Sequence, residues 1–98
     1  MSEISALELK ALIDSNKSPY ILDVRERLEF HSYNIGGTLI PLGVLPSKLE
    51  SLPEKFDEEI VVVCQKGLRS RTAQKILMQS GYTNVKNLKG GLSAFHRI

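Results

Sequence analysis

The chain has 98 residues, of which 42% are hydrophobic, a share that is ordinary for a folded globular domain. At this length we expect one domain over residues 1–98, because a second hydrophobic core would not fit. The formal net charge of +2 is too small to indicate nucleic-acid binding, so we expect no nucleic-acid partner. No apolar run is long enough to span a bilayer, so we also expect no membrane association.

The cysteine content narrows the possible chemistry. Cys64 is the only cysteine, which excludes an intramolecular disulfide and a cysteine-based metal cluster. The N-terminal residues contain no basic region followed by an apolar run, which is the pattern of a signal peptide. We therefore predict a cytoplasmic protein without a metal site, in which an exposed thiol stays reduced.

Helical and strand patterns alternate along the chain. In the first half they predict a helix from Ser5 through Ile13, a strand over 20–24, a helical turn over 25–31 and a strand over 38–40. In the second half they predict a helix over 46–52, a strand over 60–63, a helix over 70–80, a strand over 85–88 and a short C-terminal helix. Strands separated by helices predict an α/β domain with a mainly parallel sheet.

Capping signals support several of these boundaries. Ser5 and Glu8 have the spacing of a capping box at the start of the first helix. Pro46 suits the first turn of the helix over 46–52. Ser70 is interpreted as the N-cap of the helix over 70–80, and Gly81 as its C-terminal cap.

The most informative segment is the strand over 60–63 and the loop after it. Its four residues are all branched and apolar, as expected for a strand inside a covered parallel sheet. Cys64 follows directly, at the carboxyl end of the strand, where open parallel sheets bind ligands. Gly67 lets the loop adopt a positive φ, and the next helix directs N–H groups at the loop. With Lys66 and Arg69, this setting favours a thiolate and an anionic ligand.

The alternative to a catalytic role is that Cys64 is a buried structural residue. Free cysteine is often buried and inert, and for a lone cysteine this is the default interpretation. The position, the basic residues and the glycine all argue for a reactive thiol instead, and we favour that interpretation.

Short motifs with a consistent order run through the chain. They are Leu22-Asp23-Val24-Arg25-Glu26, Glu29-Phe30, Ile35-Gly36-Gly37, Ile40-Pro41, the segment 60–70, Gly81-Tyr82 and Leu88-Lys89-Gly90-Gly91. In this order and spacing they resemble the rhodanese-like sulfurtransferase family over essentially the whole chain. The resemblance implies a rhodanese-like α/β fold, with a mainly parallel five-stranded sheet flanked by helices on both faces.

The resemblance also implies an activity. Cys64 would be the catalytic residue, taking sulfane sulfur from a small anionic donor such as thiosulfate and carrying it as a persulfide. A thiophilic acceptor, cyanide in an assay, would then remove the sulfur, and no metal or cofactor is implied. Because the chain has no second thiol, the acceptor would be an external thiol or a sulfur-acceptor protein. The substrate-binding residues would be Gln65, Lys66, Gly67, Leu68, Arg69 and Ser70.

The chain departs from the family pattern at a few positions outside the cysteine loop. Asn34 and Gly36 stand where a histidine and a proline are frequent, and Phe95 stands where a tryptophan is frequent. These differences concern the subfamily and the partner more than the chemistry. The segment 37–46 resembles rhodanese domains fused to adenylyltransferases that activate sulfur carriers, which hints at sulfur delivery for cofactor or tRNA thiolation.

Two other functions are compatible with this fold. Cysteine phosphatases and arsenate reductases need five residues between cysteine and arginine to wrap a tetrahedral oxyanion, whereas Cys64 and Arg69 have four between them. A loop this tight better suits a single sulfur atom. A non-catalytic binding or regulatory module is the other alternative, although such modules often lack the cysteine.

Several other charged residues receive structural interpretations. Asp23 and Arg25 lie at the carboxyl end of the first predicted strand, and we favour a structural ion pair over a role in the site. His31 and His96 are interpreted as surface residues rather than general bases.

Overall fold

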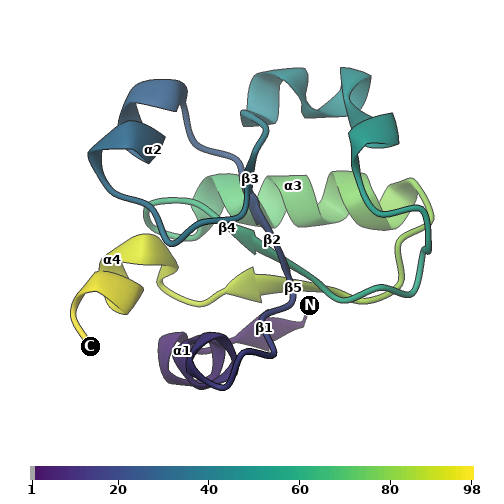
Figure 1. The fold of residues 1–98 in the computed structure, drawn as a ribbon. Coiled ribbons are helices and arrows are strands. Elements are labelled where there is room, and N and C mark those ends of the chain that lie inside the picture. The colour runs from purple at the N-terminus through teal and green to yellow at the C-terminus, as the bar shows by residue number, and fades with distance from the viewer. Residues whose placement is uncertain (1) are drawn as a thin grey trace.

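The computed structural model describes residues 2–98, and a single sheet lies at the centre of this folded part of the chain (Figure 1). Its strands are β1 (Glu3–Ile4), β2 (Tyr20–Asp23), β3 (Thr38–Leu39), β4 (Ile60–Val63) and β5 (Val85–Leu88). The five strands lie in the order β1-β5-β4-β2-β3, and each neighbouring pair is parallel. The parallel five-stranded sheet is therefore confirmed.

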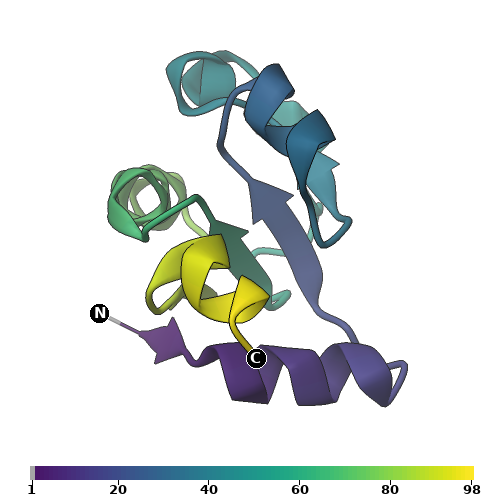
Figure 2. The same ribbon diagram turned by 90° about the vertical axis from the view of Figure 1, so that its left-hand side faces the viewer.

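Helices cover both faces of this sheet, as predicted. They are α1 (Ala6–Asp14), α2 (Arg27–Ser32), α3 (Leu68–Gln79), α4 (Gly91–His96) and two 3-10 helices, η1 (Leu42–Ser47) and η2 (Leu49–Ser51). Helices α1 and α4 lie on one side of the sheet, and α3 and the 3-10 helices lie on the other (Figures 1 and 2). No helix within residues 2–98 has both the length and the apolar character of a membrane span.

Strand β4 links the two hydrophobic cores. All four of its residues are buried, and alternate side chains point to opposite faces of the sheet. Ile60 and Val62 pack with Leu77 of α3, whereas Val61 and Val63 pack in the core beside α1 and α4. Burying each such side chain stabilises the fold by about 1.5–3 kcal/mol, which fixes the position of the residue that follows the strand.

The capping signals at the ends of two helices are confirmed. The Ser5 hydroxyl accepts from the Glu8 N–H, and the Glu8 carboxylate accepts from the Ser5 N–H. At the end of α3, the N–H groups of Gly81 and Tyr82 donate to the carbonyls of Met78 and Leu77, which is the Schellman arrangement.

Two elements differ from the sequence-based prediction. Strand β1 was not predicted, because two residues are too few to display a period, yet Glu3 and Ile4 pair with β5. The predicted helix over 46–52 is wrong. The chain forms 3-10 turns there instead, and Pro46 lies inside η1 rather than in the first turn of an α-helix. Proline cannot donate the backbone hydrogen bond that an α-helix would need at that point.

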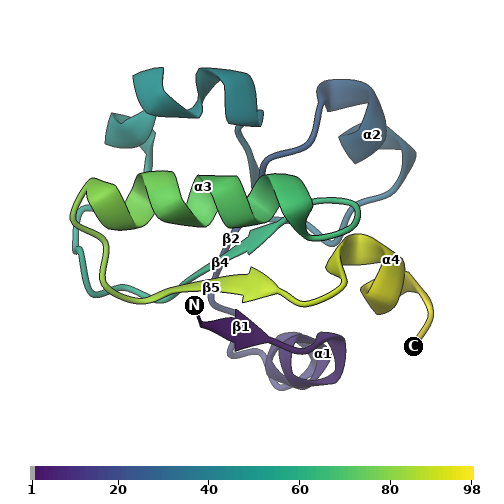
Figure 3. The same ribbon diagram turned by 180° about the vertical axis from the view of Figure 1, so that it is seen from behind.

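The cysteine loop lies at the carboxyl edge of the sheet. Strand β4 ends at Val63, and the chain turns there into α3, with α2 and α4 at the same end of the molecule (Figure 3). Parts of the chain that are distant in sequence therefore surround Cys64.

Candidate active site

The sulfur of Cys64 receives hydrogen bonds from the start of α3. The N–H groups of Gly67 and Ser70 donate to Sγ over 3.1 Å and 3.3 Å. Gly67 is the N-cap of the helix, with φ of 98°, a conformation that favours glycine. These N–H groups have no partner inside the helix, and the helix dipole adds positive potential at its N-terminus. The arrangement stabilises negative charge on the sulfur.

Ser70 holds the loop from inside the helix. The prediction that it is the N-cap is wrong, because α3 begins at Leu68 and Ser70 is its third residue. The Ser70 hydroxyl lies 3.2 Å from the Cys64 sulfur and also contacts Asn87 Oδ1. Asn87 Nδ2 donates to the Gly67 carbonyl over 3.1 Å, so Oδ1 is the atom that faces the hydroxyl. Strand β5 thus braces the loop through one amide.

Cys64 itself is almost completely covered. It is 1% exposed and packs in the core beneath α3, so the expectation of an exposed thiol is wrong. The sulfur is nevertheless hydrogen-bonded at its loop side, unlike a cysteine that only fills space.

Arg69 and Glu29 form a bidentate ion pair beside this loop. Arg69 Nη1 and Nη2 donate to Glu29 Oε1 and Oε2, each over 2.7 Å. The hydrogen bonds from Arg69 are the main cause that lowers the pKa of Glu29 to about 2. The same bonds, with further contributions from the charges of Glu29 and Cys64, raise the pKa of Arg69. Both groups are therefore charged at neutral pH.

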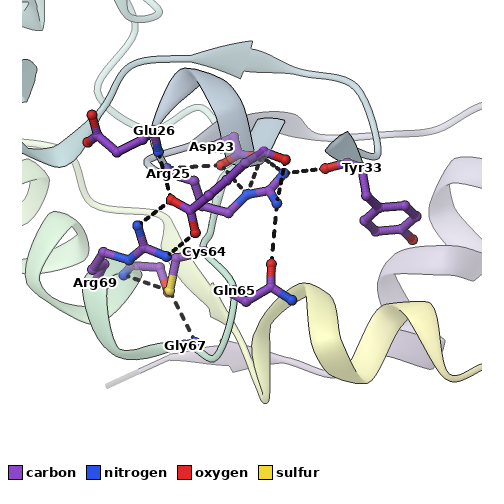
Figure 4. Close-up of polar contacts among 10 residues, drawn as sticks. Asp23, Arg25, Glu26, Tyr33, Cys64, Gln65, Gly67 and Arg69 are labelled. Atoms are coloured by element: carbon purple, nitrogen blue, oxygen red, sulfur yellow. Dashed lines mark hydrogen bonds and ion pairs between the residues drawn. The ribbon is translucent and has the colours of Figure 1, made fainter. Parts of the chain in front are cut away.

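Arg25 forms a second, buried ion pair that fastens α2 and the loop to β2. Its Nε and Nη2 donate to the carboxylate of Asp23 over 2.9–3.2 Å, and both side chains are buried. Its remaining donors reach the carbonyl of Glu29. They also reach the carbonyl of Tyr33 and the side-chain oxygen of Gln65 (Figure 4). The predicted ion pair between Asp23 and Arg25 is confirmed.

Helix α4 fixes the backbone of the cysteine itself. The N–H of Leu92 donates to the Cys64 carbonyl over 2.9 Å, and the N–H of Ser93 donates to the Gln65 carbonyl over 3.0 Å. Gln65 Nε2 also donates to the Ser93 hydroxyl over 3.0 Å. Helices α3 and α4 and strand β5 therefore hold the six residues 64–69 in place. These contacts leave the segment little freedom to change shape.

The sequence profile described as Rhodanese-like domain matches residues 5–98. The chain belongs to the rhodanese-like domain family. A sulfurtransferase from Allochromatium vinosum is 31% identical over 99% of this chain and 90% of its own length. The sulfur-transfer chemistry implied by the motifs therefore agrees with a relative of the same size.

Solved structures and fusion proteins give the same family. A rhodanese-like domain protein from Staphylococcus aureus superposes with a TM-score of 0.86 at 31% identity, covering 97% of this chain and 91% of that one. The adenylyltransferase and sulfurtransferase MOCS3-1 of Zea mays is 33% identical over 98% of this chain, which spans only 22% of that protein. Rhodanese-like domains of this type thus occur both alone and joined to an adenylyltransferase.

The substrate-binding residues expected from the rhodanese-like resemblance lie in different surroundings. Lys66 and Leu68 are exposed, and Lys66 forms no ion pair with any of residues 2–98. The Gln65 amide is engaged by Arg25 and Ser93, so it helps to hold the loop. Substrate binding by these residues stays a prediction.

Sequence reasoning gave no role to two residues that contact the loop. Glu29 appeared only within a family motif, and Asn87 only within a predicted strand. The charge of Glu29 and the amide of Asn87 within the predicted strand over 85–88 were the available signals, but neither indicates which residue is its partner. His31 and His96 are exposed, as predicted, and the His96 ring packs edge-on against Tyr33.

A cavity of about 320 Å³ opens beside the loop. Its lining consists of Arg25, Glu29, Ser32, Tyr33, Gln65 and His96. Within residues 2–98, no group of three or more His, Cys, Asp or Glu side chains is placed to hold a metal ion.

Glu29 should make the stability of the fold depend on pH at acid values. Its pKa falls from 4.5 to about 2 on folding, so its contribution is complete above pH 4.5 and is lost as pH falls toward 2. Since both partners are about one-third exposed, we expect Glu29→Gln to remove no more than about 1 kcal/mol at neutral pH.

Thermal unfolding from pH 2 to pH 7 measures this effect. Wild type and Glu29→Gln should converge in stability toward pH 2, because the wild-type carboxylate becomes protonated there. Glu26→Gln, which removes a neighbouring exposed carboxylate, serves as the control. Parallel curves for wild type and Glu29→Gln would contradict the prediction.

Proposed function

We propose that this chain is a sulfurtransferase that carries sulfane sulfur as a persulfide on Cys64. The donor is a small anion or an organic sulfane compound, and the acceptor is an external thiol or a sulfur-acceptor protein. The observation that carries the proposal is the pair of N–H groups, from Gly67 and Ser70, that donate to Sγ at the start of α3. A lone thiol of this kind fits a reducing compartment such as the cytoplasm.

The reaction proceeds in two displacements. The Cys64 thiolate attacks the outer sulfur of the donor, a sulfur–sulfur bond forms, and the donor's own sulfur–sulfur bond breaks. With thiosulfate, sulfite leaves with the bonding electron pair. The N–H groups of Leu68 and Arg69 in the first turn of α3 have no intrahelical partner, so they are available to the outer sulfur of the persulfide.

The second displacement returns the enzyme to its starting state. An acceptor thiolate attacks the outer sulfur, which leaves with the acceptor as a new persulfide, and the Cys64 thiolate is regenerated. The hydrogen bonds from Gly67 and Ser70 stabilise that leaving thiolate. Because Cys64 is 1% exposed, the acceptor has to present its thiol at the end of a narrow group.

The geometry disfavours the phosphatase and arsenate reductase alternative. Only four residues separate Cys64 from Arg69, and the Arg69 guanidinium is bound to Glu29 rather than directed at an oxyanion. The relatives that support the proposal are sulfurtransferases, alone or joined to an adenylyltransferase.

Sulfur loading on Cys64 tests the proposal directly. After incubation with thiosulfate, polysulfide or benzenethiosulfonate, intact-mass measurement should find one added sulfur atom on the wild type and none on Cys64→Ser. Circular dichroism should show that the variant is folded. The absence of an adduct with any of these donors, together with no thiocyanate from cyanide, would refute the proposal. Phosphate release from an aryl phosphate would favour the phosphatase alternative.

A further inference from the structure

We propose that Glu29 is a specificity-determining residue that selects against doubly charged sulfur donors by occupying the guanidinium of Arg69. The favoured donors are those whose sulfane sulfur is attached to an uncharged group, such as an organic thiosulfonate. The disfavoured donor is the inorganic dianion thiosulfate. This inference rests on the sulfurtransferase function proposed above and names the class of donor that the same site prefers.

The ion pair occupies both terminal nitrogens of Arg69. Both terminal nitrogens donate to the two Glu29 oxygens over 2.7 Å, which is the bidentate geometry that a guanidinium uses for anions. The Glu29 carboxylate is held in turn by the Glu26 N–H, which donates to Oε1 over 3.0 Å. A sulfonate group that binds Arg69 in the same way therefore has to displace an oriented carboxylate.

The other guanidinium near the loop cannot take over this role. Arg25 is paired with the buried Asp23, and its remaining donors are used by backbone carbonyls and by Gln65. The cavity beside the loop consequently presents the Glu29 carboxylate without a free guanidinium. Of the basic residues in the loop, only Lys66 forms no ion pair with any of residues 2–98, and its side chain is exposed.

Protonation of Glu29 does not free Arg69 to bind an anionic donor. The pKa of Glu29 is about 2, so the carboxylate stays ionised at any pH at which the thiolate reacts. A dianion that approaches the Cys64 thiolate therefore meets an arginine whose charge Glu29 already balances, so no released cation offsets its repulsion from the thiolate. A donor with a neutral sulfonyl group carries one negative charge fewer and is repelled less.

A different role for Glu29 would give the opposite result. If Glu29 only held Arg69 in place to bind thiosulfate, its replacement would slow the reaction with thiosulfate. Glu29→Gln separates the two roles, because glutamine keeps the size and one acceptor oxygen for the Glu26 N–H but carries no charge.

The experiment compares two donors that transfer sulfur by the same bond cleavage. Thiosulfate releases sulfite, and benzenethiosulfonate releases benzenesulfinate, so they differ in the charge of the leaving end. The second-order rate of sulfur loading on Cys64 is followed by intact mass. For Glu29→Gln we expect about a fivefold faster reaction with thiosulfate and less than about a twofold change with benzenethiosulfonate.

Two further variants establish the cause. Glu26→Gln removes the same charge without breaking the Arg69 pair, and it should leave both rates within about twofold of the wild type. The double variant Glu29→Gln/Arg69→Gln should react with thiosulfate more slowly than Glu29→Gln, because the gain requires a released guanidinium. Urea midpoints show whether each variant is folded under the assay conditions.

Each outcome bears on a different claim. A thiosulfate rate that falls or stays constant in Glu29→Gln overturns the inference, as does a gain that persists in the double variant. If the wild type takes no sulfur from either donor, the proposed sulfurtransferase function is what fails. If both donors load Cys64 but the ratio of their rates does not respond to Glu29, only the inference about specificity fails.

Discussion

Replacement of Arg25 by methionine should lower the free energy of unfolding by about 3–5 kcal/mol, because it leaves a buried carboxylate without its partner. The Asp23 side chain is 0% exposed and the Arg25 side chain 1% exposed, so water cannot take over the lost contacts. Arg25 Nε and Nη2 supply hydrogen bonds to both carboxylate oxygens. The urea midpoint at neutral pH measures the loss.

The effect should extend to the reactive loop. Arg25 also donates to the carbonyls of Glu29 and Tyr33 and to the side chain of Gln65, which follows the cysteine. The variant should therefore also load sulfur more slowly than the wild type under conditions in which it remains folded. The slower loading reflects the loss of the contact that joins α2 to the loop.

An exposed ion pair provides the control for Arg25→Met. Lys10 and Asp14 lie 3.1 Å apart on α1, with side chains that are 47% and 61% exposed. Lys10→Met should cost less than about 1 kcal/mol, since solvent screens such a pair. If both variants lost the same free energy of unfolding, burial would not increase the contribution of the Arg25 ion pair to stability.

The central strand and its cysteine could be predicted because the relevant signals are local. Four consecutive branched residues, Ile60–Val63, indicate a strand that is buried on both faces, and the position of Cys64 at its carboxyl end follows directly. The structure places Cys64 there, next to a helix N-terminus. The order of the motifs indicated the rhodanese-like family, and the family implied a fifth strand. That strand, β1, could not be predicted from its own two residues, because they are too few to display a period.

The partners of the loop could not be predicted because they are distant in sequence. Glu29 lies 40 positions from Arg69, and Asn87 lies 17 positions from Ser70. Charges in a sequence indicate that an ion pair is possible, but the packing of α2 against the start of α3 decides which charges meet. The sequence therefore indicated that Arg69 was a free cation, whereas in the folded chain it forms an ion pair with the Glu29 carboxylate.

The length of the cysteine loop could be predicted from the sequence, but the residue that caps the following helix could not. Four residues between Cys64 and Arg69 indicated a tight turn, and Gly67 indicated the positive φ. Ser70 was misinterpreted as a cap, because serine is common at that position of a helix. The N-cap is glycine instead, which allows the loop N–H groups to turn toward the sulfur.

Replacement of Gly91 by alanine should slow sulfur loading by about tenfold or more, because the new methyl group would push the backbone that carries the thiol. A Cβ at this position would lie 2.5 Å from the Gln65 carbonyl oxygen and 2.7 Å from the Cys64 carbonyl oxygen. Neither oxygen can move away freely, since the adjacent N–H groups of α4 hold both carbonyls. The loop has to shift, and Sγ shifts with it.

Gly36→Ala separates this displacement from backbone strain. Gly36 has φ of 88°, comparable with 64° at Gly91, but a Cβ there would meet nothing within 4 Å. Both variants should lose about 1–2 kcal/mol of stability from the left-handed conformation, and only Gly91→Ala should lose more. Gly36→Ala should load sulfur within about twofold of the wild type, since its methyl group does not contact the loop. Equal loading rates for the two variants would mean that α4 does not set the position of the Cys64 sulfur.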